Sequence, residues 1–162
     1  PGARVLVYCW RGGERSLSLA HTLSRVGWEV SVVRQGYKGY RAGVRCFLQQ
    51  LDAFRYHVIS GRTGSAKGQL LQALRAQGAQ VLDLEECANH MGSLLGDHPD
   101  SPQPSQKHFD SRLYNCLLAF DRRRPVFVEG ESAMVGRLHL PPSLWSSMKV
   151  SPQTVVELPL AE

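Results

Sequence analysis

The segment 56–74, YHVISGRTGSAKGQLLQAL, constrains the fold more than any other part of the chain. An apolar run at 58–60 precedes a glycine-containing loop at 61–68, and leucines then recur at helical spacing. A strand, a loop and a helix in this order are typical of a phosphate-binding loop, because successive N–H groups and the positive helix end face an anion. The candidate phosphate-binding residues are Gly61, Arg62, Thr63, Gly64, Ser65, Ala66, Lys67 and Gly68.

The loop departs at two positions from the usual pattern G-x-x-x-x-G-K-[ST]. Ala66 replaces the second glycine, and Gly68 replaces the hydroxyl residue that normally binds Mg²⁺. The sequence therefore supports phosphate binding, with Lys67 as a charge for the outer phosphate, more strongly than it supports Mg²⁺ coordination. A tight turn between a strand and a helix, without a ligand, is the alternative.

A second strand–loop–helix pattern surrounds Cys9. Residues 4–8, RVLVY, alternate as in a strand and lead into CWRGGERS, after which apolar residues recur at helical spacing up to Gly27. Loop N–H groups and a helix N-terminus stabilise a thiolate, persulfide or perselenide anion and lower the pKa of the cysteine. Arg11 and Arg15 add positive charge. Cys9 is thus a candidate nucleophile, and a buried small hydrophobic residue is the alternative.

Strands and helices continue to alternate along the chain, which predicts an α/β fold with a parallel sheet. Further strands are expected at 28–33, 80–84 and 126–132. One helix is expected from Val44, Phe47, Leu48 and Leu51, with Cys46 packed beside its apolar face. A longer helix with Cys116 in the core is expected from Phe109, Leu113, Cys116, Leu117 and Phe120.

The expected strand at 126–132 ends in carboxylates, which is the layout of a Walker B element. Glu129 or Glu131 could hold Mg²⁺ through water or act as a base. Without the phosphate loop upstream, a solvated turn would be the simpler interpretation.

Charge is distributed unevenly. Residues 1–67 contain eleven Lys/Arg against three Asp/Glu, a net charge of +8, whereas residues 68–162 contain eight against eleven, a net charge of −3. The basic part suits a polyanion such as RNA, and an arginine-rich solvated face is the alternative. No apolar run approaches the ~20 residues of a membrane span, so we expect no membrane partner and a cytoplasmic location. The four scattered cysteines argue against a zinc site or a disulfide framework.

Six motifs together resemble the tRNA 2-selenouridine synthase family. They are, in order, CWRGG-x-RS, GYK, G-R-T-G-S-x-K, ANH-x-GS, QPSQ-x-x-F and VFVE-x-ES, and they cover essentially the whole chain. The resemblance implies the C-terminal part of a rhodanese-like domain at 1–54, followed by a P-loop NTPase-like parallel-sheet domain at 55–162. Both domains are expected to be incomplete, which would leave sheet edges unpaired.

The resemblance also implies an activity. A transferase of this family S-geranylates the wobble 2-thiouridine of tRNA from geranyl diphosphate and then replaces sulfur by selenium from selenophosphate. Cys9 would carry the selenium, the phosphate loop would bind the diphosphate, and Mg²⁺ is a conceivable cofactor. The loop around Cys9 would consist of Trp10, Arg11, Gly12, Gly13, Glu14 and Arg15. The residues expected to line the tRNA or prenyl site are Asn89, His90, Gly92, Ser93, Gln103, Ser105 and Gln106.

Candidates for contacting the tRNA backbone are Arg4, Arg34, Arg41, Arg45 and Arg55. Two departures concern the phosphate loop, at Ala66 and Gly68, and a third is Met91, where the family usually has arginine. Two other functions stay open: a rhodanese sulfurtransferase fused to a nucleotide-dependent P-loop domain, and an inactive tRNA-binding remnant. The sequence does not indicate the oligomeric state or whether sulfur or selenium is the physiological element.

Overall fold

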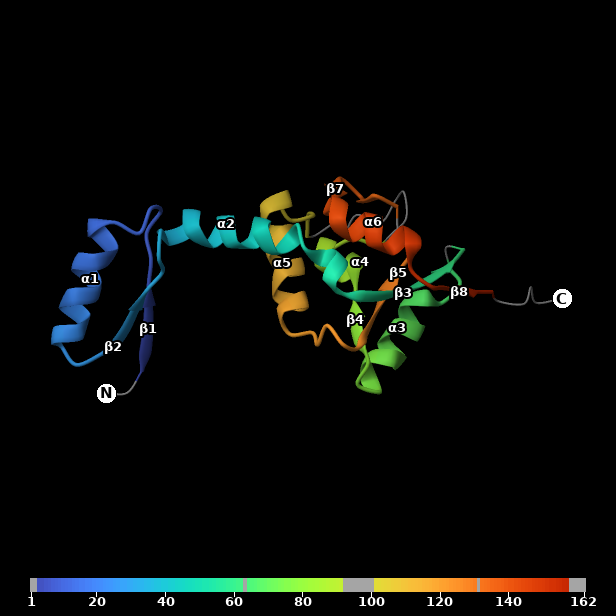
Figure 1. The fold of residues 1–162 in the computed structure, drawn as a ribbon, viewed down its shortest axis with the longest axis horizontal. Helices are drawn as coiled ribbons and strands as arrows, with labels where there is room; N and C mark the ends of the chain where they lie inside the picture. Colours follow the sequence, from blue (N-terminus) through green and yellow to red (C-terminus); the bar gives the residue numbers. More distant parts are fainter. Residues whose placement is uncertain (1–2, 63, 92–100, 131, 158–162) are drawn as a thin grey trace. The chain divides into compact units, whose positions relative to one another are not determined.

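The computed structural model describes residues 3–62, 64–91, 101–130 and 132–157, and the chain forms an α/β structure with two compact units (Figure 1). The first unit is Pro1–Cys46 and the second is Phe47–Glu162. This division precedes the predicted domain boundary at 54/55, because the Phe47 ring packs edge-on against Tyr114 and Phe54 of the second unit, with centroids 5.1 and 6.3 Å away.

The first unit is a β–α–β arrangement followed by a helix. Strands β1 (Arg4–Val7) and β2 (Glu29–Val32) pair in parallel, and α1 (Glu14–Arg25) connects them. The expected strands at 4–8 and 28–33 are therefore present, although each is slightly shorter. Val7 of β1 and Ala20 of α1 are buried.

Helix α2 (Gly36–Leu48) starts eight residues before Val44, the residue at which the predicted helical pattern begins. Its first turn contains Gly36 and Gly39, which disfavour a helix in isolation, so helix propensity predicts no helix there. Contacts with the preceding loop stabilise this turn, since the N–H groups of Tyr37 and Lys38 donate to the carbonyl oxygens of Cys9 and Trp10, at 2.9 and 3.1 Å. Leu51 lies beyond α2, in the short 3-10 helix η1 (Leu51–Ala53).

The second unit is built on a parallel sheet of four strands in the order β4–β5–β3–β8. The strands are β3 (Arg55–Gly61), β4 (Gln80–Leu82), β5 (Pro125–Glu129) and β8 (Gln153–Val156). The helices are α3 (Lys67–Ala76), α4 (Leu84–Ala88), α5 (Gln106–Leu118) and α6 (Pro142–Val150), and a small antiparallel hairpin consists of β6 (Met134–Val135) and β7 (Leu138–His139). The expected α/β fold with a parallel sheet is confirmed.

The two faces of this sheet are covered by different helices. Ile59, Leu71 and Val81 are buried together on the face covered by α3. Successive strand residues point to opposite faces, so Val58 lies on the other face, near Met148 of α6. The core therefore holds β3 between α3 and α6 (Figure 1).

The structure corrects several boundaries. Strand β4 ends at Leu82 rather than at residue 84, because the Asp83 side chain accepts a hydrogen bond of 2.8 Å from the Glu86 N–H and starts α4. Helix α5 ends at Leu118, so Phe120 lies outside it. Strand β5 ends at Glu129 rather than at residue 132.

Two cysteines expected to be packed are exposed. Cys116 lies at the edge of the buried stripe of α5, which is formed by Phe109, Leu113 and Leu117, and its side chain is exposed instead of in the core. Cys46, near the end of α2, is also exposed. Helical periodicity identified the apolar face correctly, but it did not resolve which flanking residues that face covers.

A buried glutamine fixes the turn before β5. Gln80 is 8% exposed, and its Nε2 donates to the carbonyl oxygens of Asp121 and Arg124 at 3.0 and 3.3 Å. Its Oε1 accepts a hydrogen bond from the Asp121 N–H. One side chain therefore satisfies both donors and acceptors of a turn far away in the sequence.

The Ala66 residue, immediately before α3, has a left-handed backbone with φ of 62°. A Cβ atom in this conformation is crowded by the backbone, and the strain is roughly 1 kcal/mol or more. Glycine, the usual residue at this loop position, would not be strained there.

Replacing Gln80 by Ala should lower the free energy of unfolding by about 1–3 kcal/mol, because it leaves buried backbone groups without partners. Urea unfolding of the chain measures this change. Gln72→Ala is the matched control, since Gln72 is exposed on α3 and its replacement should have little effect. Equal effects of the two substitutions would contradict the role assigned to Gln80.

Replacing Ala66 by Gly should raise the free energy of unfolding by about 0.5–1 kcal/mol, since relief of backbone strain exceeds the entropy gained by the unfolded chain. The same substitution at Ala73, an exposed position within α3, should lower it by about 1 kcal/mol. The two variants are compared by urea unfolding, and effects of the same sign would refute the assignment of strain to Ala66.

Candidate functional site: two anion-binding loops

The first candidate site is the loop that connects β1 to α1, with Cys9 at its start. The Gly12 N–H donates to the Cys9 sulfur at 3.1 Å. The Ser16 hydroxyl, in the first turn of α1, lies 3.4 Å from the same sulfur and 2.9 Å from the Gly13 carbonyl oxygen. The sulfur therefore lies where loop N–H groups and the N-terminus of a twelve-residue helix converge.

These donors lower the pKa of Cys9 to about 6. The largest cause is the hydrogen bond with Ser16; burial, the second largest, acts in the opposite direction, and the backbone N–H groups of Gly13, Arg11 and Gly12 add to the lowering. The side chains of Arg11 and Arg15, which the sequence analysis credited with this effect, are exposed and are not among the causes. Ser16 was missed as a site residue, although it is the last residue of the motif CWRGGERS.

Two glycines allow the Cys9 loop to contact the start of α2 through its backbone. Gly36 has a φ of 55°, and a Cβ atom there would overlap the Cys9 carbonyl oxygen. Gly12 has a φ of 67°, and a Cβ atom there would lie 2.8 Å from the backbone nitrogen of Gln35. The motif GYK therefore has a structural explanation, because its backbone packs against the Cys9 loop.

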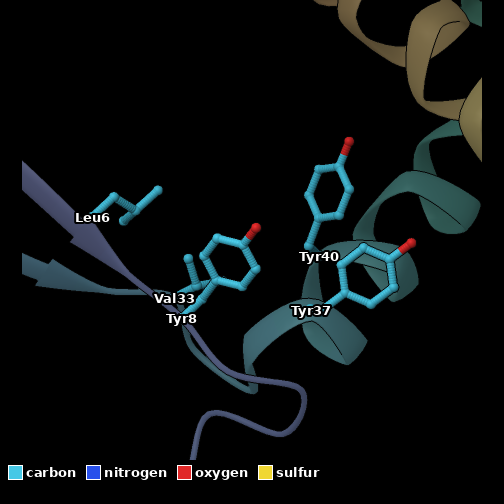
Figure 2. A pocket seen from close by; sticks show the side chains of 5 residues that line it. All are labelled: Leu6, Tyr8, Val33, Tyr37 and Tyr40. Carbon is cyan, nitrogen blue, oxygen red and sulfur yellow. The ribbon is translucent and has the colours of Figure 1, made fainter. Parts of the chain in front are cut away.

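Aromatic residues line a pocket of about 250 Å³ beside this loop (Figure 2). Trp10, one of the predicted loop residues, stacks on Tyr37 with a centroid distance of 5.2 Å. The residues that line the pocket come from β1, from the positions directly after β1 and β2, and from α2, and they are Leu6, Tyr8, Val33, Tyr37 and Tyr40.

The second candidate site is the loop between β3 and α3, which has the predicted strand–loop–helix arrangement. The Lys67 side chain folds back across this loop, and its Nζ donates to the carbonyl oxygens of Gly61 and Arg62 at 3.0 and 3.2 Å. The Ser65 N–H donates to the Arg62 carbonyl at 3.1 Å, and Gly64 has a φ of 82°. The loop is therefore compact, with an ammonium group at its centre; Thr63 lies outside the described residues.

Glu129 faces the same ammonium group from the end of β5. Its Oε1 lies 4.0 Å from Lys67 Nζ, and both side chains are largely buried, with exposed fractions of 5% and 12%. The parallel register of β3 and β5 brings them together, because Ile59 pairs with Glu129. The two predicted motifs are therefore adjacent in space, whereas Glu131 lies outside the described residues.

Glu85 is a further acidic group near Lys67 that the sequence analysis did not identify. Burial is the largest cause that raises its pKa, the Asp83 charge adds to it, and the charges of Lys67 and His90 act in the opposite direction. Its only sequence signal is its position just after β4, at the same edge of the sheet as the phosphate loop.

The described residues contain no cluster of metal-ligating side chains. No three side chains of His, Cys, Asp or Glu lie close enough together in this part of the chain to bind a metal ion. Gly68 also lacks the hydroxyl that phosphate loops use for this purpose.

The residues of the ANH and QPSQ motifs form internal hydrogen bonds. The buried Gln103 donates to the carbonyl oxygens of Ala88 and Val135 at 3.3 and 3.1 Å, and its Oε1 accepts from the Arg137 N–H at 2.9 Å. The Gln106 side chain donates a hydrogen bond to the His139 carbonyl oxygen and accepts one from the His139 N–H, each at 2.9 Å. These two amides therefore tie the hairpin β6–β7 to α4 and α5.

The remaining residues of these motifs lie nearby. Asn89 ends α4 with a left-handed backbone and donates to the Ser101 carbonyl at 2.8 Å, and His90 is buried next to it. Ser105 accepts a hydrogen bond from the His108 N–H and starts α5. Gly92 and Ser93 lie outside the described residues.

Four of the five arginines considered for tRNA contact are exposed: Arg4, Arg34, Arg45 and Arg55. Arg41 is only 6% exposed, so, unlike the other four, it is not available on the surface for a contact with the tRNA backbone. It falls on the same side of α2 as the fully buried Val44, three residues further along the helix. No helix among the described residues combines the length and the apolar composition needed to cross a membrane.

Comparisons with known proteins identify relatives over almost the whole chain. Residues 54–162 match the family model of the tRNA 2-selenouridine synthase AAA domain. Proteins named tRNA 2-selenouridine synthase from Alcanivorax borkumensis and Marinobacter nauticus are 36% and 34% identical to this chain over 93% and 96% of its length. The one from Nitrosomonas eutropha is 37% identical over 97%.

The chain spans about two fifths of the length of these relatives, 41%, 42% and 41% respectively. No solved structure matches it significantly. The match of the AAA domain model to more than half of the chain nevertheless establishes its family. This chain belongs to the tRNA 2-selenouridine synthase family, and residues 54–162 are the part that corresponds to the family's AAA domain.

Proposed function

We propose that this chain takes part in converting the wobble 2-thiouridine of tRNA into 2-selenouridine, with geranyl diphosphate and selenophosphate as co-substrates. The observation that carries the proposal is the environment of the Cys9 sulfur, which has the Gly12 N–H at 3.1 Å and the Ser16 hydroxyl at 3.4 Å. Fixed donors of this kind favour a sulfur or selenium atom that bears negative charge. The names of the relatives supply the product, 2-selenouridine in tRNA, and the motif resemblance implies the co-substrates.

Two group transfers make up the proposed reaction. In the first, the C–O bond of geranyl diphosphate breaks, a C–S bond forms to the thiouridine, and diphosphate leaves. The amides of the 61–68 loop and the Lys67 ammonium would stabilise that leaving group. In the second, a C–Se bond forms at the base, the C–S bond breaks, geranylthiol leaves, and the phosphorus of selenophosphate passes to water as phosphate.

Cys9 is the proposed nucleophile of the second transfer. Its thiolate would attack the phosphorus of selenophosphate, so that an S–P bond forms, the P–Se bond breaks, and selenium leaves as selenide with the electron pair of that bond. The selenide attacks the base, and water then cleaves the S–P bond and releases phosphate. The loop donors and the N-terminus of α1 would stabilise the Cys9 thiolate before this attack and again when it is released.

The other residues of the family motifs have a positioning role in this proposal. Gln103 and Gln106 hold the hairpin β6–β7 against α4 and α5, and Asn89 fixes the end of α4. Contacts with the tRNA backbone are assigned to the exposed arginines, Arg4, Arg34, Arg45 and Arg55. Binding through these residues would weaken as the salt concentration increases.

Two other functions make different predictions. A sulfurtransferase with a nucleotide-dependent P-loop domain would hydrolyse a nucleotide and would not need a prenyl diphosphate. An inactive tRNA-binding remnant, which Ala66 and Gly68 favour, would tolerate the loss of Cys9 or Lys67. The variants below separate these possibilities.

The pH dependence of alkylation tests the state of Cys9. Because its pKa is lowered to about 6, Cys9 should be mainly thiolate at pH 7, and its reaction with iodoacetamide should be half-maximal near pH 6. Ser16→Ala should move this midpoint upward, since it removes the largest cause of the shift. Ser18→Ala, at an exposed position of the same helix, is the control. Peptide mass spectrometry follows the modified peptide, and a midpoint above pH 8 in the unaltered chain would contradict the assignment.

Substitutions at the two loops should affect different products. In cells whose only copy of the enzyme carries Cys9→Ser, we expect 2-selenouridine to fall by about 10²-fold while geranylated 2-thiouridine persists. Lys67→Ala should lower both products. Mass analysis of wobble nucleosides provides the measurement, and Cys46→Ser and Lys107→Ala, at exposed positions, are the matched controls.

Each contrary result points to one alternative. Normal products in both Cys9→Ser and Lys67→Ala would identify an inactive remnant. Loss of nucleotide hydrolysis in Lys67→Ala, without any change in geranylated nucleoside, would favour the nucleotide-dependent sulfurtransferase.

A further inference from the structure

Two cysteines outside both candidate loops lie next to each other in the second unit. The Cys87 sulfur on α4 is 3.9 Å from the Cys116 sulfur on α5. Cys87 is 5% exposed, whereas Cys116 is exposed. The helices α4 and α5 pack against each other, so this contact is part of a fixed interface.

We propose that Cys87 and Cys116 are an oxidation site, at which a peroxide converts the two thiols into a reversible intramolecular disulfide. This inference does not depend on the proposed function. A disulfide needs its sulfurs about 2.05 Å apart, so the present contact must close by roughly 2 Å. The exposed Cys116 side chain can provide most of that movement by rotating about its own Cα–Cβ bond.

The environments of the two thiols assign them different roles. The hydrogen bond with Cys87 lowers the pKa of Cys116, against the opposing effects of burial and of the Glu86 charge, and the charge of Arg75 adds to the lowering. The hydrogen bond with Cys116 and burial both raise the pKa of Cys87. Cys116 is therefore the accessible thiolate that meets the oxidant first, and Cys87 is the partner that completes the bond.

The chemistry balances with hydrogen peroxide as the oxidant. The Cys116 thiolate attacks one peroxide oxygen, the O–O bond breaks, and Cys116 becomes a sulfenic acid while hydroxide leaves and is protonated to water. The Cys87 sulfur then attacks the Cys116 sulfur, and the sulfenic oxygen leaves as a second water with the Cys87 proton. The two sulfurs together lose two electrons, and the peroxide gains them.

A disulfide here would restrain the segment that leads to the ANH motif. Arg112 of α5 already donates to the Cys87 carbonyl oxygen at 3.2 Å, and Gln103 donates to the next carbonyl, that of Ala88. A covalent bond would add to these contacts and hold α4 against α5. It would also fix the position of Glu85, two residues before Cys87, whose carboxyl group interacts electrostatically with Lys67.

The test uses the chain with Cys9→Ser and Cys46→Ser, which retains only Cys87 and Cys116. One equivalent of hydrogen peroxide should lower the intact mass by about 2 Da and join the tryptic peptides 76–107 and 113–122. Dithiothreitol should reverse both changes. Oxidation should also raise the midpoint of thermal unfolding by roughly 5–10 °C, because the bond closes a loop of the unfolded chain.

Adding Cys116→Ser to this background provides the single-thiol control. Because Cys116 is exposed, this variant should fold normally, and peroxide should produce neither the mass loss nor the joined peptides. The proposal is overturned if the two-thiol chain yields only sulfinic acid or intermolecular dimers. It is also overturned if both thiols remain alkylatable at their original rates after peroxide treatment.

Discussion

The parallel pairing of β3 with β5 is the interaction on which the second unit depends. Each strand is followed by a candidate functional segment at its carboxyl end, and the register places Ile59 opposite Glu129. The Gly130 N–H then donates to the Ile59 carbonyl at 2.7 Å, which continues the contact beyond β5. The ammonium of Lys67 and the carboxylate of Glu129 therefore face each other because of backbone pairing, and a shift by one residue would turn Glu129 to the other face of the sheet.

The loops at Cys9 and at Lys67 would stabilise negative charge with different groups. At Cys9 the negative charge belongs to the protein, so neutral donors, the Gly12 N–H and the Ser16 hydroxyl, are sufficient to stabilise it. At the 61–68 loop a negative charge would come from a ligand, and the Lys67 ammonium, which the Glu129 carboxylate also faces, is the charged group that would meet it. In both cases the loop follows a strand and leads into the N-terminus of a helix.

The sequence predicted those structural features that depend on residues close together in the chain. Both strand–loop–helix segments were identified correctly because their strands, glycines and helical leucines are local signals. The start of α2 was not, since Gly36 and Gly39 have low helix propensity and contacts with the Cys9 loop override it. The amides of Gln103 and Gln106 bind a hairpin about thirty residues further along the chain, and no local pattern encodes such a contact.

The hydrogen bonds of Lys67 to the Gly61 and Arg62 carbonyl oxygens have a consequence for ligand choice. Whatever enters the loop must take this ammonium away from two acceptors that it already has, so binding is an exchange of partners rather than a simple addition. A neutral ligand would accept no stronger hydrogen bond from Lys67 than those carbonyl oxygens do, whereas a multiply charged anion would. The hydrogen bonds of Lys67 would thus favour anionic ligands over neutral ligands of the same shape.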